Sequence, residues 1–200
     1  MTPEQGGLRV AVADDDPAIL EFVRDVLEGM GHAVTASCAT GQELIDACAS
    51  NPPDLVVTDV KMPGIDGIEA TATINRRKAT PAILVTSFGE TDLIGRALRT
   101  SVLAYLIKPI KQIDLEVAIA VAMRRFREHR AICDEAAALR QSLEERKQIE
   151  RAKGVLMRRG QLGEEEAYKR LQKISTENSR KLPETARMVI SIDREFRGNS

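Results

Sequence analysis

The sequence alternates five short apolar runs with helical patterns, and this alternation constrains the fold more than any other feature. The apolar runs, which we predict to be strands, are residues 8–13, 33–37, 54–58, 82–86 and 102–107. Helical patterns lie between them at residues 17–29, 41–50, 65–77 and 90–99. Strands that alternate with helices in this way form a parallel sheet with helices on both faces. We therefore predict an α/β domain over residues 8–122, with a doubly wound five-stranded parallel sheet.

A fifth helix is predicted from about Lys111, and no Gly or Pro interrupts it before Gly154. It can therefore leave the domain and continue as a linker helix over residues 123–148. Apolar residues in this stretch are spaced alternately by four and three positions: Ile132, Ala136, Leu139 and Leu143. This is the spacing of a coiled-coil seam and predicts a homodimer when the protein is activated. A solvated single helix is the alternative, because the seam is short.

After Gly154 the pattern changes to three short helices. The first ends at Gly160, the second starts after Gly163 with three consecutive glutamates, and the third begins around Pro183. Acidic residues in a first turn and proline near a helix start both suit the unpaired N–H groups at that end of a helix. We predict an all-α second domain, a small three-helix bundle over residues 149–195.

The composition is that of a soluble globular protein with an aliphatic core. Hydrophobic residues make up 43% of the chain and charged residues 30%, whereas aromatic residues make up only 3%. The N-terminal segment has no signal-peptide pattern, and no apolar run approaches the roughly 20 residues that span a bilayer. We therefore expect a cytoplasmic protein with no membrane partner. Cys38, Cys48 and Cys133 lack the spacing of a zinc or disulfide framework, so we expect three reduced, mostly buried thiols.

The net charge of −1 conceals two segments of opposite sign. Residues 1–138 hold 14 Lys and Arg against 20 Asp and Glu, whereas residues 139–200 hold 15 against 10. The first segment therefore carries −6 and the second +5. Such an asymmetry indicates different partners for the two segments, and a basic segment suits nucleic acid.

Polar side chains follow four of the predicted strands. They are Asp14, Asp15 and Asp16 after the first strand, Asp59 at the end of the third, Thr86 at the end of the fourth and Lys108 after the fifth. Because the carboxyl ends of parallel strands meet at one edge of a sheet, we expect these side chains to converge. Neighbouring carboxylates repel one another unless a cation compensates, and Mg²⁺ is the hard cation that suits such oxygen ligands. Asp16 precedes Pro17 and is expected instead to cap the next helix.

Residues 9–121 resemble the receiver domain of two-component response regulators, which has a flavodoxin-like fold. The resemblance rests on the acids, the threonine and the lysine at the strand ends, on the string KMPGIDG after Asp59, and on Tyr105 before Lys108. It implies that a sensor histidine kinase is the partner. It also implies that Asp59 is the nucleophile that accepts a phosphoryl group from a phosphohistidine.

The resemblance implies a magnesium site around Asp59. Asp15 and Asp59 would bind Mg²⁺ directly, and the backbone carbonyl of Lys61 would supply a third oxygen. Asp14 would act through a water molecule. The metal would then neutralise the adjacent acids, which explains how they tolerate one another.

The resemblance also implies the roles of three residues on the last two strands. Lys108 would neutralise phosphoryl oxygens during transfer. Thr86 would donate its hydroxyl to the phosphoryl group, and Tyr105 would occupy the space that Thr86 vacates, as a two-state switch. One departure from the family is the string RTSVLAY, which lacks the glycine that commonly precedes the fifth strand. This departure bears on the shape of the loop.

Residues 149–190 resemble the ANTAR domain, the RNA-binding output module of transcription antitermination regulators. The positions that carry this resemblance are mostly small or apolar: Ala152, Lys153, Leu156, Met157, Ala167, Tyr168, Leu171, Leu182 and Ala186. It implies that the protein binds RNA stem-loops in nascent transcripts and prevents a terminator hairpin from forming. No constellation of catalytic residues follows residue 122, where one His and one Cys occur, so the output is expected to be binding and not enzymatic.

RNA binding requires cations for phosphates and flat side chains on which bases stack. The candidate cations are Lys153, Arg158, Arg159, Lys169, Arg170, Lys173, Arg180 and Lys181, and Tyr168 is the candidate stacking surface. The alternative for Tyr168 is a core position, and for Arg158, Arg159 and Lys169 a solvated face.

Two other functions fit the sequence. One is a DNA-binding regulator, because three short helices can present a recognition helix, and the other is a phospho-relay adaptor whose tail binds only protein.

Overall fold

The computed structural model describes residues 7–87 and 102–198, so the helix predicted at 90–99 lies outside the described residues. The chain divides into two compact units, Met1–Arg130 and Ala131–Ser200. Within the described ranges, no helix is both long and apolar enough to cross a membrane.

The N-terminal unit contains a five-stranded parallel sheet, as predicted. Its strands are β1 (Arg9–Ala13), β2 (Ala33–Cys38), β3 (Leu55–Asp59), β4 (Ala82–Thr86) and β5 (Val102–Ile107). They are arranged in the order β2-β1-β3-β4-β5, and every neighbouring pair is parallel. This is the flavodoxin-like order, in which ligands bind beyond the carboxyl ends of the strands.

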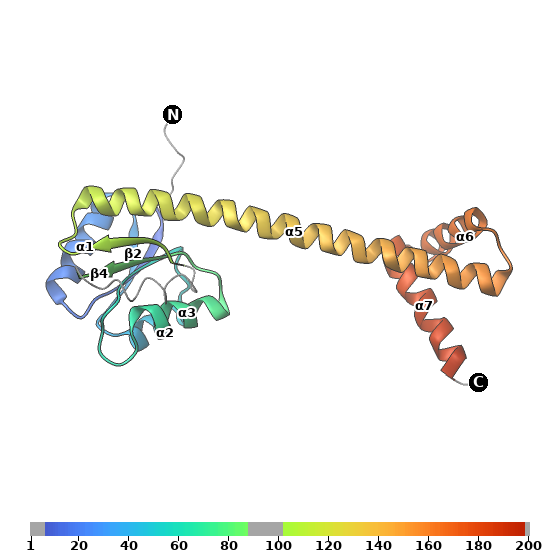
Figure 1. Ribbon diagram of the computed structural model, residues 1–200, viewed down its shortest axis with the longest axis horizontal. Coiled ribbons are helices and arrows are strands. Elements are labelled where there is room, and N and C mark those ends of the chain that lie inside the picture. The colour runs from blue at the N-terminus through green and yellow to red at the C-terminus, as the bar shows by residue number, and fades with distance from the viewer. Residues whose placement is uncertain (1–6, 88–101, 199–200) are drawn as a thin grey trace, which may run out of the picture. The chain divides into compact units, whose positions relative to one another are not determined.

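Helices cover both faces of the sheet because alternate side chains of each strand point to opposite faces (Figure 1). Val10 and Val12 face α1 (Pro17–Gly29) and the first turns of α5 (Gln112–Gly160). Their neighbours Ala11 and Ala13 face α2 (Gly41–Ser50) and α3 (Gly67–Arg77). The small alanines therefore let α2 pack close to β1, whereas the larger valines fill the opposite face.

Three helices that begin near the carboxyl edge of the sheet, α1, α2 and α3, are each capped by a side chain. Asp16 accepts a hydrogen bond from the Ala18 N–H at 2.9 Å, so its predicted role as a helix cap is confirmed. Thr40 caps α2, and Asp66 caps α3 by accepting from the Glu69 N–H at 2.7 Å. These caps fix where each helix starts relative to the strand ends, which positions the loops of the site.

The predicted change of pattern at Gly154 is wrong, because α5 continues without a break from Gln112 to Gly160. A glycine inside a helix costs about 1 kcal/mol relative to alanine. Here its neighbours Ala152 and Val155 are buried in the core of the C-terminal unit, and that packing offsets the cost. The first helix of the predicted bundle is therefore the last part of α5.

The C-terminal unit completes its core with α6 (Glu164–Glu177) and α7 (Leu182–Gly198). Its buried side chains come from all three helices: Ala152, Val155, Leu171, Ala186 and Val189. The Glu166 carboxylate accepts a hydrogen bond from the Gly163 N–H at 3.0 Å and so caps the start of α6. The unit is thus a small helical assembly with an aliphatic centre.

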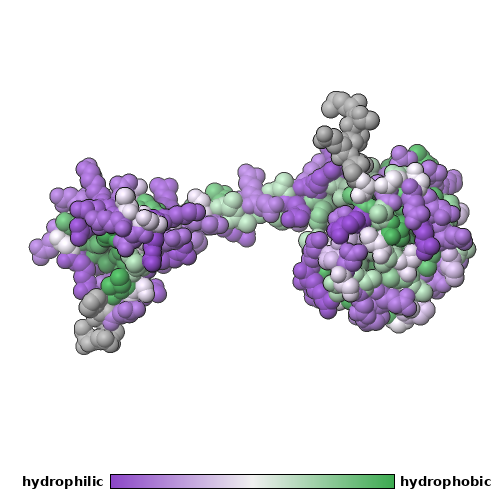
Figure 2. All heavy atoms as spheres, turned by 180° about the vertical axis from the view of Figure 1, so that it is seen from behind, coloured by the Kyte–Doolittle hydropathy of each residue, from purple (hydrophilic) through white to green (hydrophobic). Residues whose placement is uncertain are grey.

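Several hydrophobic side chains of α5 are exposed. Ile132, Leu139 and Leu143 have exposed fractions of 66%, 62% and 51%. Figure 2 shows hydrophobic residues on the surface of this helix, while the surface around α6 and α7 is largely hydrophilic. Cys133 is also exposed, whereas Cys38 and Cys48 are buried in the N-terminal unit.

Candidate functional site

Asp59 is a buried carboxylate at the carboxyl end of the central strand β3. Its exposed fraction is 6%. One oxygen, Oδ1, accepts a hydrogen bond from the Val60 N–H at 2.8 Å, and the other, Oδ2, accepts one from Lys108 Nζ at 3.1 Å. The side chain is therefore held in one orientation at the edge of the sheet.

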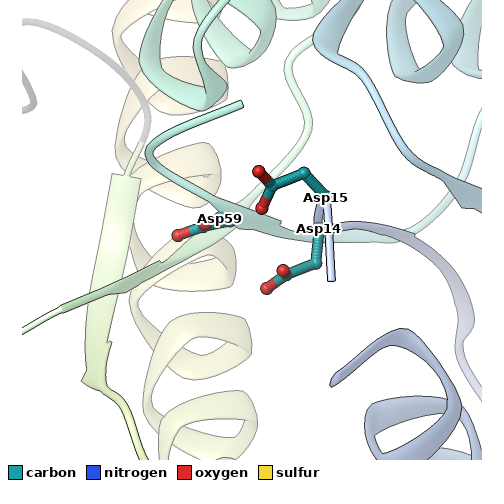
Figure 3. A group of neighbouring side chains, drawn as sticks. All are labelled: Asp14, Asp15 and Asp59. Atoms are coloured by element: carbon teal, nitrogen blue, oxygen red, sulfur yellow. The ribbon is translucent and has the colours of Figure 1, made fainter. Parts of the chain in front are cut away.

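Asp14 and Asp15 lie next to Asp59, and carboxylate oxygens of the three residues lie within 4.8 Å of one another (Figure 3). Asp14 is 2% exposed, and its Oδ1 accepts a hydrogen bond from the Asp16 N–H at 3.0 Å. Its Oδ2 forms an ion pair with Lys108 Nζ at 2.9 Å and accepts no other hydrogen bond from the described residues. In the part of the chain that is described, this is the buried side-chain oxygen that lacks a hydrogen-bond partner. Such an oxygen suits a hydrated divalent cation.

The charges of the site do not balance, since the buried carboxylates of Asp14 and Asp59 contact one ammonium group and the exposed carboxylate of Asp15 lies beside them. Burial raises the pKa of Asp59 above its ordinary value, and the hydrogen bond from Lys108 opposes this only in part. Burial lowers the pKa of Lys108, but the contacts with Asp14 and Asp59 raise it by more, so the net direction is upward. Lys108 therefore stays charged at neutral pH, and the cluster retains excess negative charge.

Gly67, which was not among the predicted site residues, lies against the backbone of Asp59. A Cβ at this position would be 1.9 Å from the Asp59 carbonyl oxygen, so a larger residue cannot be accommodated without moving β3 or α3. The Gly67 N–H also donates to the Val60 carbonyl oxygen at 3.0 Å. The signal in the sequence was the second glycine of KMPGIDG.

The remaining predicted receiver residues lie around this cluster at different depths. Thr86 ends β4, its Oγ1 donates to the Ser87 carbonyl at 3.3 Å, and its own carbonyl accepts from the Lys108 N–H at 2.9 Å. Tyr105 is 40% exposed on the neighbouring strand β5, where it is paired with Leu84. Lys61 is exposed in the loop two residues after Asp59.

A second feature that was not predicted is an apolar hollow of about 490 Å³ beside Lys108. It is lined by Ala18, Ile19, Phe22, Lys108, Pro109 and Ile110. Phe22 is 39% exposed although it is aromatic. No pattern in the sequence indicates this hollow, because α1 and the segment after β5 lie far apart in the chain.

In the C-terminal unit, the predicted RNA-binding cations of α5 contact acids. Lys153 is 8% exposed, and its Nζ lies 2.7 Å from Glu164 and 3.0 Å from Glu150. Arg159 Nε donates to the buried Asp193 at 2.8 Å. The hydrogen bonds that Lys153 donates to Glu164 and Glu150 raise the pKa of Lys153.

The other predicted cations are exposed, as is Arg159. Arg158 lies 3.9 Å from Asp193, and Lys169 and Lys173 pair with glutamates one turn away on α6 at 2.7 and 3.8 Å. Arg170, Arg180 and Lys181 make no ion pair within the described residues. Tyr168 is 38% exposed, with Lys153 Nζ 6.0 Å from the centre of its ring, so it lies at the surface and not in the core.

Comparison with known proteins agrees with this geometry. The family model of the response regulator receiver domain matches residues 10–120, and that of the ANTAR domain matches residues 137–190. The transcriptional regulatory protein PdtaR of Mycobacterium tuberculosis is 36% identical over 182 residues, which cover 91% of this chain and 89% of the relative. Both domains of the chain therefore have a counterpart in a single relative.

Other similar proteins match a smaller part of the chain. The DNA-binding response regulator MtrA of Mycolicibacterium smegmatis is 30% identical over 117 residues, which cover 58% of this chain and 51% of the relative. The crystal structure of the signal receiver domain of a modulated diguanylate cyclase from Desulfovibrio desulfuricans is 25% identical, with a TM-score of 0.58. That match covers 62% of this chain and 98% of the other. The chain belongs to the response regulators, with an N-terminal receiver domain and a C-terminal ANTAR domain.

Proposed function

We propose that a histidine kinase phosphorylates Asp59 and that this phosphorylation controls RNA binding and transcription antitermination by the C-terminal unit. The observation that carries the proposal is the buried Asp59 at the end of β3, whose Oδ2 lies 3.1 Å from Lys108 beside Asp14 and Asp15. The domains would be the receiver, residues 8–122, a linker helix, 123–148, and the RNA-binding module, 149–195. The protein would act in the cytoplasm, where nascent transcripts are found in bacteria.

The transfer step needs positioning and charge more than it needs covalent catalysis. A carboxylate oxygen of Asp59 attacks the phosphorus of the phosphohistidine. The new P–O bond forms as the P–N bond breaks, and the imidazole nitrogen keeps the electron pair and takes a proton from solvent. The ammonium group of Lys108 reaches Asp59 and would neutralise phosphoryl oxygens during this step.

Magnesium is the cofactor that fits the acids around Asp59. Asp15 and Asp59 would hold it directly, the Lys61 carbonyl would supply another oxygen, and Asp14 would act through water. The buried Oδ2 of Asp14, which lacks a hydrogen bond, supports this assignment. When bound, the ion supplies positive charge for the phosphoryl oxygens.

Thr86 and Tyr105 would form the switch that reports the phosphoryl group. Thr86 ends the strand next to β5, and its backbone carbonyl is already bound to the Lys108 N–H. A hydroxyl that turns to the phosphoryl group would leave space on the side of β5, where Tyr105 is now 40% exposed. A two-state change of this kind alters the surface of β5 without unfolding the sheet.

Dimerisation through α5 would bring two RNA-binding modules together. Ile132, Leu139 and Leu143 expose apolar surface at the spacing of a coiled-coil seam. Two linked modules bind an RNA with two stem-loops more tightly than one module does, by roughly 100- to 10,000-fold, without any new contact. The same helix contributes residues to the cores of both units. A change in the receiver domain can therefore reach the RNA-binding module through this helix.

The test combines phosphorylation with nucleic-acid binding. The full chain is treated with acetyl phosphate and Mg²⁺, and its affinity is measured for a two-stem-loop RNA, a one-stem-loop RNA and duplex DNA. We expect labelling and a selective gain for the two-loop RNA, together with a dimer in light scattering. Tighter binding to duplex DNA would favour a DNA-binding regulator. If the protein binds none of these nucleic acids at low salt, the result would favour a phospho-relay adaptor.

A further inference from the structure

The C-terminal unit separates its charges along α6. Residues 161–168, at the start of α6, contain three glutamates and no Lys or Arg. Residues 178–190, which form the α6–α7 turn and the start of α7, contain three Lys and Arg against one Glu. A polyanion such as RNA is repelled by the first segment and attracted by the second. We therefore expect it to bind near the end of α6 and not near its start.

The cations near the start of α6 are already neutralised. Lys153 contacts two carboxylates, at 2.7 and 3.0 Å, and is 8% exposed. Arg159 donates its Nε–H to the buried carboxylate of Asp193 at 2.8 Å. An RNA phosphate that bound Lys153 would have to compete with both carboxylates, and Asp193 holds the partly exposed guanidinium of Arg159 through its Nε–H. These residues are better explained as contacts that join α5 to α6 and α7.

The cations of the α6–α7 turn are Arg180, Lys181 and Arg187, which we call the turn cations. All three are exposed, and they make no ion pair among the residues described. The one acid of this segment, Glu184, also makes no ion pair there. The turn cations therefore retain their full charge toward solvent.

Hydrogen bonds order the backbone of the turn around Arg180. Ser179 has a positive φ of 50°, and the Arg180 N–H donates to the Ser175 carbonyl at 3.0 Å. The Ser175 hydroxyl donates in return to the Arg180 carbonyl at 2.6 Å. The Arg180 guanidinium reaches Met188 Sδ at 3.5 Å, which brings it to the turn of α7 that carries Arg187. The turn cations are thus close together in the chain, around an ordered turn and the first turns of α7.

We propose that the turn cations contact the phosphate backbone of the RNA, and that Lys153 and Arg159 hold the three helices together instead. This inference rests on the proposed RNA binding and assigns it to one surface. A side chain that contacts a phosphate releases counterions, so its loss lowers the salt dependence of binding. A residue that only supports the fold changes stability and leaves the salt dependence unchanged.

The test measures the affinity of the full chain, treated with acetyl phosphate, for a two-stem-loop RNA between 50 and 300 mM salt. The triple variant Arg180→Gln, Lys181→Gln and Arg187→Gln should lower the slope of log K against log salt by about 2, since each phosphate contact contributes about 0.7–0.9. The double variant Lys169→Gln and Lys173→Gln, which removes exposed but acid-paired cations of α6, should lower it by less than about 0.5. Lys153→Met should lower the melting temperature and leave the slope unchanged.

Circular dichroism and melting curves confirm that each variant is folded, and Lys181→Gln alone carries the test if the triple variant is not. An unchanged slope in the turn variants, with normal binding by the parent protein, overturns the inference and leaves the proposed function intact. A parent protein that binds no RNA overturns the proposed function itself. Equal or tighter binding to duplex DNA through the same turn cations would replace RNA by DNA as the partner.

Discussion

The two units of the protein differ in how well their buried charges are balanced by counter-ions. In the receiver domain, the buried carboxylates of Asp14 and Asp59 share the ammonium group of Lys108, the exposed Asp15 adds a third negative charge, and one oxygen of Asp14 is left without a hydrogen bond. In the ANTAR unit each buried ion has at least one close counter-ion, since Lys153 contacts two glutamates and Asp193 contacts Arg159. Unbalanced charge marks a site that binds or reacts, whereas balanced charge marks one that supports the fold.

The largest effect expected from this comparison is on phosphorylation. Asp59→Asn should reduce labelling by acetyl phosphate to background, because the amide keeps the shape of the side chain but is a poor nucleophile. Mass spectrometry of the intact chain measures the added phosphoryl group. Asp14→Asn is the matched control, since it removes a neighbouring carboxylate and leaves the acceptor, and it should slow labelling without abolishing the covalent product. A phosphorylated Asp59→Asn chain would mean that another residue is the acceptor.

A smaller effect on phosphorylation is expected when Lys108 is replaced. Lys108→Ala should slow labelling by about 100- to 1,000-fold, the usual loss when one preorganised group that stabilises developing charge is removed. Initial rates with acetyl phosphate at fixed Mg²⁺ measure it. Lys111→Ala, which removes an exposed lysine three residues later, should leave the rate unchanged. Equal rates in the parent protein and Lys108→Ala would place Lys108 outside the transfer step.

In the ANTAR unit, replacing a buried carboxylate should lower the free energy of unfolding. Asp193→Asn removes the buried carboxylate that holds Arg159 and should lower the free energy of unfolding by about 1–3 kcal/mol. Glu177→Gln breaks an exposed pair with Lys173 and should change it by less than about 0.5 kcal/mol. Urea unfolding followed by circular dichroism measures both, and equal small effects would show that Asp193 is not a structural ion.

Much of the receiver domain could be predicted because its signals are local. Each strand was bounded within one residue by its apolar run, and Asp16 was recognised as a cap from its place before Pro17. The convergence of Asp14, Asp59 and Lys108 followed from strand ends meeting at one edge of a parallel sheet. The close approach of Gly67 to Asp59 could not be predicted, because it depends on how α3 is placed against β3.

Less of the ANTAR unit could be predicted, because there the decisive contacts join distant residues. Lys153 resembled a free cation in the sequence, but its partner Glu164 lies 11 residues away on another helix. Arg159 and Asp193 are 34 residues apart. Gly154 resembled a helix boundary by propensity, and packing of its neighbours overrode that preference. A charge count gives the sign of a segment, but only the fold shows which cations remain available.

The smallest expected effect concerns what the unbalanced charge does to the stability of the receiver domain. Burial raises the pKa of Asp59, so the folded chain holds this proton more tightly than the unfolded chain does. By linkage, the Asp59 contribution to the free energy of unfolding falls as the pH rises from about 4 through the native pKa, and stays low above it. Asp59→Asn lacks this ionisation. Without metal, it should therefore be more stable than the parent protein at pH 7.5.

Urea midpoints in EDTA between pH 4.5 and 7.5 test this prediction, and the gap between Asp59→Asn and the parent protein should shrink as the pH falls. Because bound Mg²⁺ neutralises the same acids, added Mg²⁺ should stabilise the parent protein more than the variant and close the gap at pH 7.5. Asp54→Asn is the control, since Arg9 lowers the pKa of this carboxyl, and its loss should act in the opposite direction. A gap for Asp59→Asn that is independent of pH would mean that ionisation of Asp59 does not destabilise the receiver domain.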